Sequence, residues 1–120
     1  KAFAHSYDSR RFGQHGSIQR IQAECEEAVR QTTTLSRNAG ADSAAILAKI
    51  RCNIYAMRSL NNLSQSSAGK ALLDDARLQT LQNTIDRYLS FLTTGMDTGE
   101  YQTSLQTALA ELQEIVNDLN

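Results

Sequence analysis

The chain of 120 residues contains no proline and only six glycines, and this scarcity of helix-breaking residues constrains its fold more than any other feature. Proline and glycine are the residues that most often interrupt a helix, so a chain with so few of them can form long helices. The glycines stand between stretches in which apolar residues recur every three or four positions, which is the period of an α-helix. The pattern predicts an all-α protein whose helices are joined by short loops.

The helical period can be followed through four stretches, and these are residues 18–36, 43–63, 74–94 and 98–119. Short connections make successive helices antiparallel neighbours. We therefore expect an antiparallel up-down four-helix bundle over residues 17–120, with an array of three long helices as the alternative. Residues 64–70, SQSSAGK, have the composition of a small polar linker between the second and third stretches.

The ends of the helices and part of the core can also be predicted. Asp74 or Asp75 is suited to cap the third helix, and Asp97 with Glu100 has the spacing of a capping box at the start of the fourth. The fourth helix has the strongest apolar period in the chain. In that helix we expect three buried side chains, those of Leu105, Leu112 and Ile115.

Residues 1–16 show no helical period, and we expect them to form an irregular N-terminal tail before the bundle domain. The tail is aromatic, with Phe3, Tyr7 and Phe12, and aromatic side chains of this kind can dock onto the body of the domain. Both histidines, His5 and His15, also lie in this segment. We interpret them as exposed residues of the tail.

The sequence contains none of the motifs that would indicate an enzyme or a cofactor site. It has no GxGxxG, GxxxxGK[ST] or GxSxG segment, and none of the four predicted helices has the Glu-x-x-His pattern of a di-iron bundle. Cys25 and Cys52 fall in different helical phases, and no Cys/His cluster is present, so we predict two free thiols, with Cys25 buried. We therefore expect no catalytic residues, no cofactor and no metal.

Charge is divided unevenly between the two halves of the chain. Residues 1–60 hold nine Lys or Arg against five Asp or Glu, whereas residues 61–120 hold three against eight. The total charge of −1 does not favour nucleic acid as a partner. The division has two interpretations: oppositely charged faces stabilise the order of the helices within the bundle, or one charged face receives a partner.

The stretch 43–63 is apolar on two sides. Its main stripe consists of Ile46, Leu47, Ile50, Ile54 and Met57, and a second strip on nearly the opposite side consists of Ala45, Cys52, Ala56 and Leu63. A helix in a closed four-helix bundle needs only one apolar stripe. We predict that the second strip, with Lys49 beside it, binds a protein partner, most simply an amphipathic helix. Because Arg51 and Arg58 lie on the wider outer surface, that helix is expected to be acidic. In the alternative interpretation, the aromatic tail or a neighbouring helix covers the strip.

The order of these features resembles that of the flagellin-export chaperone family. The resemblance is carried by Tyr7 and Phe12 leading to Ser17, and by the stretch AGADSAAILAKIRCNIYAMRSLNNL at residues 39–63. It implies a cytoplasmic antiparallel helical bundle with an aromatic N-terminal arm. It also implies a function, which is to wrap the C-terminal helices of flagellin before its assembly.

Three classes of function remain as hypotheses. The first is a non-enzymatic helical bundle that presents a groove to a partner helix or extended segment, as an export chaperone does. The second is a bundle of a bacterial toxin or secreted effector that contacts an anionic membrane surface; at the end of the bundle where basic and apolar residues gather, the lipid contacts would be Arg10, Arg11, Lys70, Leu72 and Leu73. The third is a self-assembling structural subunit that forms homo-oligomers.

Overall fold

The computed structural model describes the backbone of residues 2–37 and 42–119, and the side chains of residues 16–37 and 42–119. It consists of four helices, α1 (Ala2–Arg37), α2 (Ser43–Ala68), α3 (Asp75–Thr94) and α4 (Gly99–Asn117), and the described part of the chain contains no strand. The predicted all-α class is confirmed. None of the helices among the described residues combines the length and the apolar character that crossing a lipid bilayer requires.

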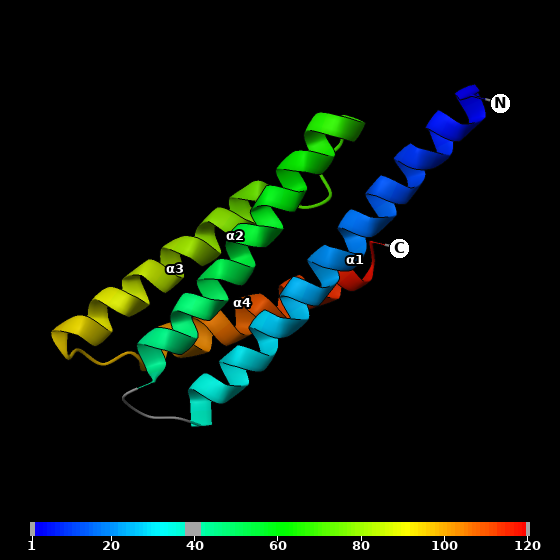
Figure 1. The fold of residues 1–120 in the computed structure, drawn as a ribbon. Coiled ribbons are helices and arrows are strands. Elements are labelled where there is room, and N and C mark those ends of the chain that lie inside the picture. The colour runs from blue at the N-terminus through cyan, green and yellow to red at the C-terminus, as the bar shows by residue number, and fades with distance from the viewer. Residues whose placement is uncertain (1, 38–41, 120) are drawn as a thin grey trace.

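The four helices form an up-down-up-down bundle in which each helix packs against two others (Figure 1). Helix α1 contacts α2 and α4, and α3 contacts the same two helices, so the diagonal pairs stay apart. The end of α1, the start of α2 and the connection after α3 lie at one end of the bundle, and the connection between α2 and α3 lies at the other. This is the four-helix arrangement expected from the short loops, and the alternative of three long helices is wrong.

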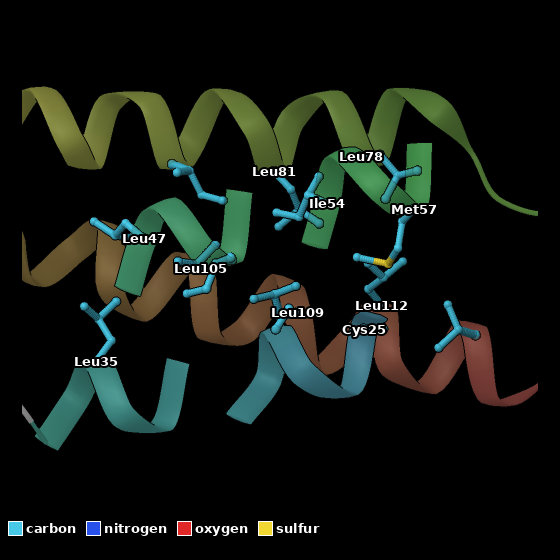
Figure 2. Packing of buried hydrophobic residues seen from close by; sticks show 14 of the residues in the cluster. Cys25, Leu35, Leu47, Ile54, Met57, Leu78, Leu81, Leu105, Leu109 and Leu112 are labelled. Carbon is cyan, nitrogen blue, oxygen red and sulfur yellow. The ribbon is translucent and has the colours of Figure 1, made fainter. Parts of the chain in front are cut away.

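The core is built from one stripe of each helix, and Figure 2 shows these side chains meeting between the four helices. The main stripe of α2 lies there, as predicted. In α4, Leu105 and Leu112 are fully buried as expected, but Ile115 is 37 % exposed. The buried positions of α4 are Leu105, Leu109, Leu112 and Val116, whose spacing of four, three and four residues keeps one face inward. Ile115 lies beside this face, so its prediction as a core residue is wrong.

Two helices are longer than the apolar pattern indicated. Helix α1 begins at Ala2, so the expected irregular tail over residues 1–16 is helical over the part that the structure describes, and His5 and His15 stand in a helix. Helix α2 continues to Ala68 and includes most of the expected linker. Glycine inside a helix costs only about 1 kcal/mol, which makes Gly13 and Gly16 weak stop signals in a segment without proline.

The ends of the helices are set by local hydrogen bonds. Gly69 and Gly95 adopt left-handed φ angles of 72° and 74° at the ends of α2 and α3, a conformation that favours glycine. The Asp74 side chain accepts a hydrogen bond from the Ala76 N–H at 3.1 Å and caps α3, as predicted. The capping box at α4 is wrong, because the residue before that helix is Thr98, and Asp97 accepts from the Gly99 N–H at 3.0 Å instead.

A buried asparagine holds the connection between α2 and α3. Asn61 is only 1 % exposed; its Nδ2 donates to the Leu73 carbonyl at 2.9 Å, and its Oδ1 accepts from the N–H groups of Leu72 and Leu73, both at 2.8 Å. Ser64 adds a hydrogen bond from its Oγ to the Lys70 carbonyl at 3.1 Å. These bonds fix the loop against α2 and place the Leu73 side chain in the core.

Candidate functional site

The second strip of α2 lies on the outside of the bundle. Ala45, Cys52 and Leu63 are exposed, Leu63 at 57 %, and Ala56 is half-buried. Lys49 is exposed beside them. The structure therefore brings the five predicted residues to one surface, which we call the α2 strip, and among the described residues no helix covers it, since α2 packs only on α1 and α3.

A shallow depression of about 360 Å³ lies at the edge of the α2 strip that faces α1. It is lined by Glu27 of α1 and by Ala48, Lys49, Cys52 and Asn53 of α2. Two of these residues, Lys49 and Cys52, were predicted. Ala48 could have been found because it precedes Cys52 by one helical turn. Glu27 could not, because its place depends on how α1 and α2 are aligned against each other.

Polar contacts organise the wall of the depression. Arg30 and Gln31 donate to the Glu27 carboxylate, and these hydrogen bonds, the one from Arg30 first, lower the pKa of Glu27. Asn53 donates from Nδ2 to Glu24 at 2.7 Å and so ties α2 to α1. The Oδ1 atom of the same asparagine is buried without a hydrogen-bond partner among the described residues. The depression thus joins an apolar floor of small residues to a charged rim.

The other two basic residues of α2 do not belong to this surface. Arg58 forms a two-pronged ion pair with Asp75, both bonds at 3.0 Å, and also donates to Gln82 at 2.6 Å. Arg51 pairs with Asp86 at 3.3 Å. Both cations therefore face α3, which corrects the expectation that they help to select an acidic partner.

The two cysteines are free, as predicted. Cys25 lies in the core, and its burial raises the pKa of the thiol to about 12, so the thiol stays protonated at neutral pH. Cys52 is exposed on the α2 strip.

The two leucines that were expected at the alternative lipid surface are not exposed there. Leu73 is 6 % exposed and lies in the core, and Leu72 is half-buried against it, because the bonds from Asn61 hold both backbone amides. Of the three residues expected on the loop side of that surface, only Lys70 is exposed.

The remaining residues of the N-terminal hypotheses lie outside the described side chains. They are Phe3, Tyr7 and Phe12 of the proposed docking contact and Arg10 and Arg11 of the proposed lipid contact. The same holds for the side chains of His5 and His15. In the part of the chain where side chains are described, no three His, Cys, Asp or Glu residues converge in a way that could hold a metal ion.

Comparison with protein-family models, with curated proteins and with solved structures finds no match for this chain.

Proposed function

We propose that this protein is a non-enzymatic binding module whose α2 strip receives an amphipathic helix of another protein. One observation carries the proposal. The apolar residues of α2 divide into two sets, of which one fills the core while the other lies at the surface, next to a depression and uncovered by any described helix.

The chemistry of the α2 strip supports an amphipathic helix as the ligand. Alanine and cysteine side chains let a helix approach closely, Leu63 offers one large apolar contact, and Lys49 with Glu27 provides charged groups at the rim. A helix that binds in this way presents apolar anchors one and two turns apart. Ala45, Cys52, Ala56 and Leu63 are also spaced by one and two turns, so a helix with this repeat can align its apolar face with the α2 strip.

A more specific form of the proposal is an export chaperone in the cytoplasm that binds the C-terminal helices of flagellin. It rests on the resemblance of residues 39–63, with Tyr7, Phe12 and Ser17, to that family. The antiparallel bundle and the uncovered strip on its second helix are compatible with this role.

The test uses a fluorescently labelled synthetic peptide of the flagellin C-terminal helices and the full chain. We expect fluorescence anisotropy to show binding to the wild type, and Cys52→Glu and Leu63→Glu to weaken it by about tenfold or more, because a carboxylate cannot be buried against an apolar helix at low cost. Both positions are exposed, so the melting temperature should remain within a few degrees of the wild type.

Asn62→Glu is the matched control. Asn62 is exposed on the same helix, and its substitution by glutamate adds the same charge as the other two variants. It lies about 100° around the helix from Leu63 and therefore outside the α2 strip. Peptide binding that is equal in the control and in Cys52→Glu would overturn the α2 strip as the site. If the wild-type chain does not bind the flagellin peptide, the export-chaperone form of the proposal is overturned.

A further inference from the structure

Several charged side chains around the α2 strip are already engaged within the bundle. On the α3 side, Arg51 and Arg58 pair with carboxylates of α3. On the α1 side, the carboxylate of Glu27 accepts hydrogen bonds from Arg30 and Gln31. A ligand on the strip would have to break an internal contact of the bundle in order to use any of these groups.

Lys49 is the one cation among the described residues that line the depression beside the strip. It is exposed and forms no ion pair with any described residue. The pKa of Glu27 is lowered first by the hydrogen bonds from Arg30 and Gln31 and last by the charge of Lys49, so the two rim charges are near each other without pairing. The ammonium group of Lys49 is therefore open to a carboxylate from another molecule.

The depression beside Lys49 is suited to an apolar side chain. Ala48 and Cys52, which lie one helical turn apart, contribute short side chains to its lining. Asn53 offers no acceptor to a ligand, because its Oδ1 is buried, and its Nδ2 already donates to Glu24 at 2.7 Å. A polar ligand group would lose its water here without gaining a partner, so leucine, methionine or phenylalanine suits this hollow of about 360 Å³ better.

We propose that the α2 strip selects amphipathic helices that carry a carboxylate one turn away from a large apolar side chain. The apolar side chain enters the depression over Cys52, and the carboxylate pairs with Lys49. Lys49 precedes Cys52 by three residues, or about 4.5 Å along α2, and residues three or four apart on the ligand are separated by a similar rise. A second acid facing α1 would meet the carboxylate of Glu27, so the ligand needs one acidic residue at this point and not an acidic face. The inference rests on the proposed function and names the kind of helix that its site takes.

Four synthetic peptides provide the test. Each is a fluorescently labelled amphipathic helix with a leucine at the centre of its apolar face. One pair carries either glutamate or lysine one turn before that leucine, the other pair carries them one turn after it, and glutamine stands at the position that is not tested. Both positions are needed because a ligand helix can run in either direction along α2. Fluorescence anisotropy measures the binding of each peptide to the full chain and to its variants.

We expect the wild type to bind the glutamate peptide of one pair about five- to tenfold more tightly than the lysine peptide, and high salt to reduce this difference. Lys49→Gln should abolish the preference, and Lys49→Glu should reverse it. Lys70→Glu is the matched control, because Lys70 is exposed beyond the end of α2 and its substitution changes the charge equally; it should keep the wild-type preference. All three variants change exposed residues, so they should melt within a few degrees of the wild type.

Two results would overturn this specificity and leave the α2 strip as the site. One is a wild type that binds both peptides of each pair equally, and the other is a Lys49→Glu variant that keeps the wild-type preference, in each case with Cys52→Glu still weakening the binding. If no peptide binds to the wild type, or if Cys52→Glu binds all four as tightly as the wild type does, the proposed function and this inference fail together.

Discussion

Replacing Asn61 by alanine tests whether the connection between α2 and α3 is held by this one side chain. The substitution removes three hydrogen bonds to the loop. The N–H of Leu72 can reach water because Leu72 is only half-buried, but the N–H and C=O of the buried Leu73 lose their partners. An unpaired buried backbone group costs about 1–3 kcal/mol, so Asn61→Ala should lower the free energy of unfolding by about 2–6 kcal/mol.

Urea unfolding followed by circular dichroism measures this loss, with Asn62→Ala as the control. Asn62 is exposed in the same turn of α2, and its truncation should change the free energy by no more than about 0.5 kcal/mol. If the two alanine variants differ by less than that amount, Asn61 does not hold the loop and the reasoning fails.

The isosteric variant Asn61→Asp separates the hydrogen bonds from packing. At neutral pH the carboxylate still accepts from both N–H groups but faces the Leu73 carbonyl without a proton to donate. Because this position is buried, the pKa of the introduced carboxyl should rise above its unfolded value, so its destabilising effect should grow as pH rises through the folded pKa. At acid pH the protonated carboxyl can donate to the carbonyl, and the variant should approach the wild type. An effect that is independent of pH would show that only the shape of the side chain matters.

Three further predictions concern the core and the two cysteines. Leu112→Ala should lower the free energy of unfolding by about 2–5 kcal/mol, whereas Ile115→Ala should cost less than about 1.5 kcal/mol; equal losses in urea unfolding would contradict the assignment of Ile115 to the surface. Alkylation of the native protein should label Cys52 alone, with Cys25 labelled only after unfolding, and mass spectrometry distinguishes one label from two. The folded pKa of Cys25, about 12, lies above its unfolded value of 9.0, so stability should fall as pH rises through this window, and a Cys25→Ala variant that keeps the whole alkaline decline would disprove the contribution of the thiol.

The sequence was sufficient to predict the number of helices and most of their inward faces, because both depend on local periods and caps. The main stripe of α2 and the cap at Asp74 are examples, and each is determined by residues within a few turns. It was not sufficient at the N-terminus, where residues 1–16 lack an apolar helical period and yet belong to α1 from Ala2 onward. It was also not sufficient at Ile115, because Ile115 and Val116 are adjacent and which of the two faces the core depends on where α1 and α3 lie.

Contacts between different helices could not be predicted from the sequence for a different reason. Arg58 meets Asp75 only because α2 and α3 are aligned in one particular way, and no local pattern specifies that alignment. Asn61 had the appearance of an ordinary polar residue, since its burial depends on a loop that folds back over it. The α2 strip, by contrast, could be located because it is defined within a single helix, but the depression beside it includes Glu27 of α1.

The uneven division of charge along the chain is explained in part by ion pairs between the helices. Basic residues of α2 pair with acids of α3, and Arg77 of α3 pairs with Glu111 of α4, so part of the asymmetry stabilises the order of the helices. These pairs are largely exposed, and each contributes at most about 1 kcal/mol. Among the described side chains, Glu114 and Asp118 at the end of α4 stand outside these ion pairs.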